Sequence, residues 1–227
     1  MKRRSSSLRK LRPVTPRLIA PAIFILALGG CGGGKNLQLD ETGGAKIVRS
    51  TCPAVAVPAY TGDITVFTPA ESRDARALDV SATITNLRTT CDETGTVVKM
   101  VATFDVAARR ASPFGARDIV LPYFATVLRA GTRIMSKQES RVAVHFADGQ
   151  VRATAQAQAG AEIEKALATL PELAQTRLNR KRKATDADAS IDPMNDPQVK
   201  AAVNQANFEL LLGFQLNEAQ LAYNATK

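Results

Sequence analysis

The sequence predicts an antiparallel β-sandwich of about six or seven strands, followed by C-terminal α-helices. Between residues 54 and 157, apolar side chains recur at every second position, which is the period of a strand with one buried face. Short segments of turn composition separate these runs, and connections of this length join antiparallel neighbours. Beyond residue 160 the apolar side chains recur with the helical period instead. The predicted fold class is therefore mainly β.

The strand period is clearest in two stretches. Residues 80–84 show it over a short run, and in 97–106 the apolar face is longer, comprising Val98, Met100, Ala102, Phe104 and Val106. The run 119–128 is apolar at both odd and even positions, which predicts a central strand. Pro122 indicates a bulge or an edge stretch within that strand, because proline cannot donate a ladder hydrogen bond.

Turn signals occur at 92–95, 112–115 and 130–131. Asp148 followed by Gly149 is typical of a two-residue hairpin, so we expect 142–146 to pair with 151–157. The alanines of 151–157 leave a helix as the alternative there. The strands are spaced more loosely than in an immunoglobulin domain, and the chain has no tryptophan. The predicted sandwich is therefore immunoglobulin-like in general architecture only.

Residues 159–227 are predicted to form a helical C-terminal segment. Over 161–170 the apolar side chains follow the spacing of one helix face, and after Pro171 a further helical turn extends to residue 178. A charged linker follows at about 179–197, with basic residues first and aspartates after them. From Pro197 an apolar stripe predicts a helix through residue 212, Gly213 permits a break, and 217–221 resembles a capped final turn.

The N-terminus has the composition of an export leader. The first 17 residues carry seven basic and no acidic side chains, and the apolar run 18–28 follows, interrupted only by Pro21. As a helix this run would be about 16 Å long, which is too short for a hydrocarbon core of about 30 Å. A basic start, a short apolar run and small residues at the exit are the three parts of a signal peptide.

The leader ends in Leu28, Gly29, Gly30 and Cys31, and this end resembles the lipobox of bacterial lipoproteins. The resemblance covers about the first 31 residues. It implies cleavage between Gly30 and Cys31, a diacylglycerol on the sulfur of Cys31, and acylation of the new amino end by a fatty acid such as palmitate. An ordinary secretory signal with an incidental cysteine is the alternative.

The same resemblance implies a location. Gly32 stands where an aspartate often marks retention in the inner membrane, which favours an outer-membrane lipoprotein that faces the periplasm. The body also resembles uncharacterised envelope lipoproteins of Gram-negative bacteria, and this resemblance implies no functional residue. The predicted organisation is a cleaved signal peptide (1–30), the lipidated Cys31 with a flexible tether (31–51), a sandwich (52–158) and the helical segment (159–227).

The basic character of the chain lies in the leader. The full chain has a formal charge of +9, but without residues 1–30 it would carry 23 basic and 21 acidic residues. We therefore expect no nucleic-acid partner.

Cys52 and Cys91 are predicted to form a disulfide, because an oxidising periplasm favours bonding of an isolated pair. Two buried free thiols, or a reactive or metal-binding pair, are the alternatives. The chain has no CxxC spacing and only one histidine, His145, so we expect no metal site.

No catalytic motif is found in the sequence. His145 alternates with Val144 and Phe146, which predicts a surface or edge position, and no GxSxG, Walker or dinucleotide pattern occurs. We therefore expect a non-enzymatic protein without a cofactor. The first hypothesis is an interaction or scaffold module, anchored in the membrane by its N-terminal lipid and bound to an envelope protein partner. The alternative is a binding module for a small or lipidic ligand between the sheet and the C-terminal helices.

Overall fold

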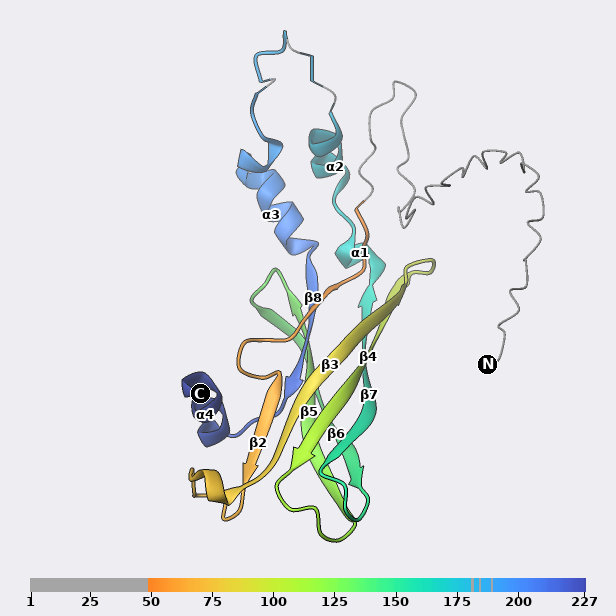
Figure 1. Ribbon diagram of the computed structural model, residues 1–227. Coiled ribbons are helices and arrows are strands. Elements are labelled where there is room, and N and C mark those ends of the chain that lie inside the picture. The colour runs from red at the N-terminus through yellow and green to blue at the C-terminus, as the bar shows by residue number, and fades with distance from the viewer. Residues whose placement is uncertain (1–48, 181, 184, 189) are drawn as a thin grey trace, which may run out of the picture.

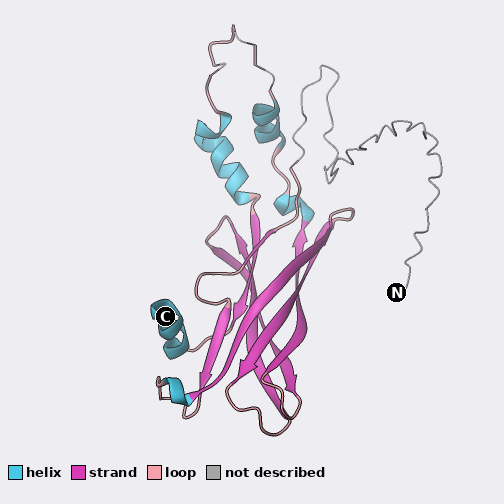
Figure 2. Ribbon diagram, in the orientation of Figure 1, coloured by secondary structure: helices cyan, strands magenta, loops and turns pink. Residues whose placement is uncertain are grey.

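The computed structural model describes residues 49–180, 182–183, 185–188 and 190–227. Gly30 and Cys31 lie outside the described residues, together with the rest of 1–48. Within the described ranges, eight strands form two four-stranded sheets that pack face to face, with helices at one end and at one side (Figures 1 and 2). The predicted fold class is confirmed: the protein is mainly β, with two largely antiparallel sheets and C-terminal helices.

The first sheet is antiparallel throughout, in the order β2-β3-β4-β7. Its strands are β2 (Asp63–Phe67), β3 (Leu78–Asp92), β4 (Val97–Arg110) and β7 (Arg152–Glu164). The second sheet has the order β1-β8-β5-β6 and is antiparallel except where the short β1 pairs with β8. Its strands are β1 (Ala54–Ala56), β8 (Phe208–Phe214), β5 (Arg117–Arg129) and β6 (Arg133–Phe146).

Helices occupy two places on the sandwich. The end of the sandwich at which β7 stops and β8 starts carries three helices (Figure 1), namely α1 (Lys165–Ala168), α2 (Glu172–Asn179) and α3 (Pro197–Gln205). The last helix, α4 (Glu218–Thr226), lies beside β2. Two short 3-10 turns, η1 (Ala75–Ala77) and η2 (Pro193–Asn195), complete the elements.

The core lies between the two sheets, where the strand period places it. The buried face of β4 consists of the residues the alternation predicts: Val98, Met100, Ala102, Phe104 and Val106. Phe104 contacts Tyr123 of the opposite sheet edge-on, with ring centroids 5.3 Å apart. This geometry is the favoured one for aromatic pairs and fills the centre of the sandwich.

Three sequence predictions about strand connections are confirmed. Residues 92–95 form the turn between β3 and β4, and 130–131 lie in the loop between β5 and β6. Pro122 lies in a stretch of β5 that pairs with β6 alone, because the ladder with β8 begins only at Tyr123. The missing N–H of Pro122 therefore leaves no ladder bond open, and its carbonyl accepts from the backbone N–H of Gln215 at 3.0 Å.

The hairpin predicted at Asp148 and Gly149 is wrong. The strand β6 pairs with β5, and β7 pairs with β4, so the connection crosses from one sheet to the other. Gly149 has a φ of +78°, which explains why the sequence carries a turn signal at this corner. Residues 152–164 are a strand, so the helical alternative for the alanine-rich stretch is also wrong.

The predicted boundary between sandwich and helical segment is wrong as well. The strand β7 continues to Glu164, so the helix expected over 161–170 begins only at Lys165. Residues 208–214, expected to continue a helix, form β8. Strand β8 lies between β1 and β5, and a run that is apolar at nearly every position suits such a central strand as well as a buried helix. The helices α1–α3 are thus inserted between two strands of the sandwich.

Gly213 has a different role from the predicted helix break. It lies in β8, and a Cβ added there would be 2.3 Å from Oγ1 and 2.7 Å from Cβ of Thr61. The loop before β2 therefore approaches β8 closely only because position 213 has no side chain.

We expect Gly213→Ala to lower the free energy of unfolding by about 1–3 kcal/mol, because the loop at Thr61 must move away from β8. Urea unfolding of the two proteins measures the difference. Gly95→Ala is the matched control, since the nearest atom to its added Cβ would be 3.9 Å away. Equal losses in the two variants would contradict the role of close approach.

The C-terminal helix covers the open edge of β2. Asn224 is buried, and its Nδ2 donates to the carbonyls of Tyr60 at 2.8 Å and Asp63 at 2.7 Å. One helical turn earlier, Nε2 of Gln220 donates to the carbonyl of Thr65 at 3.4 Å. Side chains of one helix face thus partner two alternate carbonyls of the edge strand β2 and one just before it, which protects the edge from pairing with another chain.

Candidate functional site

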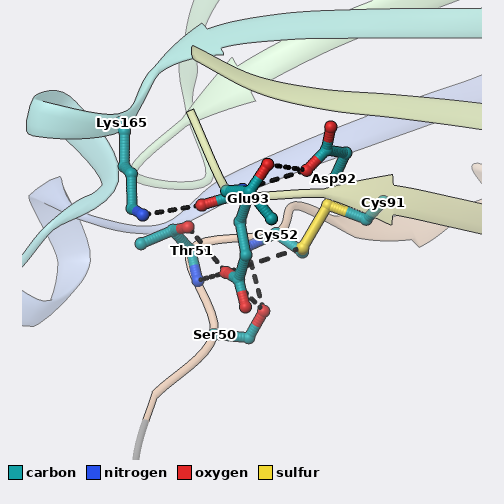
Figure 3. The surroundings of a disulfide bond; sticks show 8 residues. Ser50, Thr51, Cys52, Cys91, Asp92, Glu93 and Lys165 are labelled. Carbon is teal, nitrogen blue, oxygen red and sulfur yellow. Dashed lines mark hydrogen bonds between the residues drawn. A yellow bond between two sulfur atoms is a disulfide. The ribbon is translucent and has the colours of Figure 1, made fainter. Parts of the chain in front are cut away.

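The chain enters the fold through a clamp at the helix-bearing end of the sandwich (Figure 3). We use the term entry clamp for Ser50, Thr51 and Cys52 together with Cys91 and Glu93. The predicted disulfide is present. Cys52 is bonded to Cys91, the second-last residue of β3, and their Cα atoms are 6.2 Å apart. The segment before β1 is therefore covalently attached to the tip of the β3–β4 hairpin.

Glu93 completes the entry clamp by hydrogen bonding. Its Oε2 accepts from the backbone N–H of Thr51 at 2.9 Å, from the hydroxyl of Thr51 at 2.7 Å and from the hydroxyl of Ser50 at 3.2 Å. Its backbone carbonyl accepts from Nζ of Lys165 in α1 at 2.6 Å. Three segments that are far apart in sequence are thereby joined at one point, as Figure 3 shows.

The entry clamp makes the stability of the protein depend on pH. The hydroxyl and the N–H of Thr51 favour the charged carboxylate and hold the pKa of Glu93 below its ordinary value. A lowered pKa in the folded state contributes stability above the unfolded pKa of about 4.3, and this contribution is lost as the pH falls through the folded value.

We therefore expect Glu93→Gln to lower the melting temperature at pH 7, with the difference from wild type shrinking progressively below about pH 4. Thermal unfolding across this pH range measures the effect. Glu162→Gln, at an exposed position on β7, is the control. A difference between wild type and Glu93→Gln that stays constant down to acid pH would contradict the assigned role.

A cavity of about 530 Å³ lies beside the entry clamp. Arg49 and Thr51, the helices α1–α3, the α1–α2 connection and η2 line it. Its five apolar side chains are Ala168, Leu170, Leu178, Met194 and Val203. Its polar lining is Arg49, Thr51, Thr169, Gln175 and Asn179. A volume of this size lies within the range of small-molecule sites, about 300–1,000 Å³, and a mainly apolar wall with a few polar groups is typical of them.

Local sequence explains why the helices enclose this space. The helix α3 begins with Pro197, and the carboxylate of Asp196 caps it by accepting from the N–H of Gln198 at 2.8 Å. Arg177 of α2 forms an ion pair with the same aspartate. Ala174 of α2 and Val199 of α3 are buried. The two helices are thus held together by one apolar seam and one charged contact.

The charged linker balances its own charges in the described part. Arg180 forms ion pairs with Asp186 at 3.7 Å and with Asp188 at 3.1 Å. Arg182 also lies near Asp188, at 3.9 Å. Among the described residues that line the cavity, Arg49 is the one with a charged side chain.

The structure does not bring the other sequence candidates together. His145 lies on the edge strand β6 as predicted, its side chain is 66% exposed, and its Nδ1 is 2.6 Å from Oδ1 of Asp118. Neither residue lines the cavity. Among the described residues, no three His, Cys, Asp or Glu side chains are grouped closely enough to hold a metal ion.

The sequence interpretation missed the residues that line the cavity. It placed a ligand between the sheet and the helices, whereas the cavity lies among the helices and the entering chain. The apolar stripe of 161–178 was a usable signal, but nothing in the sequence pattern indicates that Arg49 lines the same cavity as Leu178 and Met194.

In the part of the chain that the structure describes, none of the helices has the length and apolarity needed to cross a membrane. Comparison of the chain with protein-family models, with curated proteins and with solved structures gave no match.

Proposed function

We propose that this protein is a non-enzymatic lipoprotein of the bacterial envelope that binds a small, largely apolar ligand in the cavity beside its entry clamp. The cavity is the observation that carries the binding function, because its volume and apolar wall are those of a small-molecule site. In this proposal acyl chains on Cys31 hold the protein at the outer membrane, facing the periplasm.

The leader and the lipobox support the anchor. Residues 31–48 precede the described chain, and 18 residues can span at most about 60 Å when fully extended. The folded body, and with it the cavity, would thus stay within that distance of the membrane. Two or three acyl chains give stable anchoring, whereas one chain binds only marginally.

Metabolic labelling with an alkyne analogue of palmitate tests the anchor. We expect the label on the wild-type protein and on Cys52→Ala, and no label on Cys31→Ala. Retention of the label by Cys31→Ala would contradict lipidation at this cysteine.

A polarity-sensitive apolar dye, N-phenylnaphthylamine, tests the cavity. For this experiment the mature chain is exported behind an ordinary cleavable leader and carries Cys31→Ala, so that its own acyl chains are absent. We expect saturable binding of one dye molecule per chain. Gln175→Trp should weaken dye binding by about tenfold or more, because the indole fills space that the dye needs.

Thr176→Trp is the matched control for this test. Thr176 is the next residue on α2, is exposed like Gln175, and does not line the cavity. We expect its dye affinity to equal that of the unsubstituted chain. Absence of saturable binding, or the same affinity in both tryptophan variants, would contradict binding in the cavity.

Service as a scaffold for an envelope protein partner is the second candidate function. Two large apolar side chains at the β5–β6 hairpin are exposed, Ile134 by 64% and Met135 by 42%, and either can serve as a contact for a partner. Photo-crosslinking in cells from position 134, compared with position 173 on α2, tests this function. We expect a discrete envelope protein to be captured from position 134 only.

A further inference from the structure

Resting on the proposed function, we infer that the ligand of the cavity is a single-chain amphiphile with an anionic head group. Its chain would lie along the apolar wall formed by α1, α2 and α3, and its head group at Arg49. This inference adds a ligand class and a specificity-determining residue to the proposed binding function.

The volume and lining of the cavity support a single apolar chain. The five apolar side chains come from α1, the α1–α2 connection, α2, η2 and α3, so the apolar lining is contributed by several elements. A volume of about 530 Å³ is that of a site for one drug-sized molecule. A phospholipid with two long chains is larger than such a molecule.

The charges around the cavity support an anionic head group. Arg49 is the only charged residue among the described residues of the lining, and it forms no ion pair or hydrogen bond with any other described residue. Two further charges of opposite sign lie in or beside the entry clamp and not in the lining: Nζ of Lys165 donates to the backbone carbonyl of Glu93, and Oε2 of Glu93 accepts from Thr51 and Ser50. An exposed guanidinium at the edge of an apolar cavity is complementary to a carboxylate or phosphate.

The head group is tested by displacing N-phenylnaphthylamine with dodecanoate or dodecanol, which have the same chain length but differ in the charge of the head group. We expect dodecanoate to displace the dye at a concentration about fivefold lower than dodecanol, which is the effect of one partly screened ion pair. Arg49→Gln should abolish this preference, and Arg133→Gln, at an exposed arginine on β6, should retain it. Molar salt should reduce the preference in the wild-type chain.

Chain length tests the apolar wall. Each added methylene that becomes buried should strengthen binding by up to about fourfold, until the chain fills the cavity. Lysophosphatidylglycerol with the same dodecanoyl chain distinguishes the source of the ligand. Tighter binding of this lysolipid than of dodecanoate would identify the ligand as a fragment of a membrane lipid, and tighter binding of dodecanoate would identify it as a free fatty acid. Either result supports a ligand with one apolar chain and an anionic head group.

Three outcomes would overturn the inference, and they are distinguishable. If dodecanoate and dodecanol bind equally while Gln175→Trp blocks both, the anionic class is wrong and binding in the cavity stands. If Arg49→Gln keeps the preference for dodecanoate, the assigned residue is wrong. If neither molecule displaces the dye and the dye itself does not bind, the proposed function fails together with the inference.

Discussion

Reduction of the Cys52–Cys91 disulfide is expected to lower the free energy of unfolding by about 3–4 kcal/mol, because the bond closes a loop of about 40 residues in the unfolded chain. The bond also holds the entering segment against the hairpin tip, so the loss includes contacts of the entry clamp. Thermal unfolding with and without reductant measures the effect. For a domain of this size, it corresponds to a decrease in melting temperature of roughly 6–16 °C.

The double variant Cys52→Ala/Cys91→Ala is the control for reduction. It should unfold at the temperature of the reduced wild type and be insensitive to reductant. A wild-type melting temperature that does not change with reductant would contradict the stabilising role of the bond. In the reduced protein we also expect weaker dye binding, because Thr51 lines the cavity and adjoins Cys52.

Replacement of Arg110 by alanine is expected to destabilise the fold by about 3 kcal/mol, because a buried cation with several hydrogen bonds is removed from its acceptors. Arg110 is only 3% exposed, at the end of β4. Its guanidinium donates to four backbone carbonyls at 2.7–2.9 Å, those of Pro113, Gly115, Ala147 and Gln150. These carbonyls belong to two of the connections that cross between the sheets, β4–β5 and β6–β7.

The aromatic ring of Phe146 adds a further contact, since its centroid lies 5.2 Å from the guanidinium carbon of Arg110. Arg110→Lys tests the geometry rather than the charge, because an ammonium cannot reproduce the planar set of donors. We expect it to recover less than half of the stability lost in Arg110→Ala. Arg109→Ala, at the exposed neighbouring position, is the control and should change stability by about 0.5 kcal/mol or less. Equal stability of Arg110→Lys and wild type, measured in urea, would contradict this account.

The buried position of Arg110 could have been predicted from the sequence, but the carbonyls that accept its hydrogen bonds could not. The alternation that buries Val106 and Ala108 continues to Arg110, so the period alone places this arginine on the inner face. The strand period cannot show which carbonyls satisfy it. They come from connections 3 to 40 residues away in sequence, and only the crossing of the chain between sheets brings them together.

The wrong prediction of a helix over residues 208–214, which form β8, has a similar physical cause. In this run the buried positions Phe208, Leu210, Leu212 and Phe214 follow a period of two, but Leu211 and Gly213 are apolar or small too. A helical and an extended pattern are then indistinguishable in one sequence. This run is a strand because it pairs with β1 and β5. The close approach of Thr61 to β8 requires a glycine at position 213.

The sequence alone determined what depends on local order: the mainly β class, the buried face of β4, the hairpin between β3 and β4, and the two cysteines able to bond in an oxidising compartment. It also predicts the leader and the lipid anchor at Cys31. Tertiary structure alone decided which strands share a sheet, where the helices are inserted, and which side chains line the cavity. The reason is that strand pairing and helix packing bring residues that are remote in sequence to one place, and no spacing along the chain encodes this arrangement. Arg49 and Met194, for example, line the same cavity.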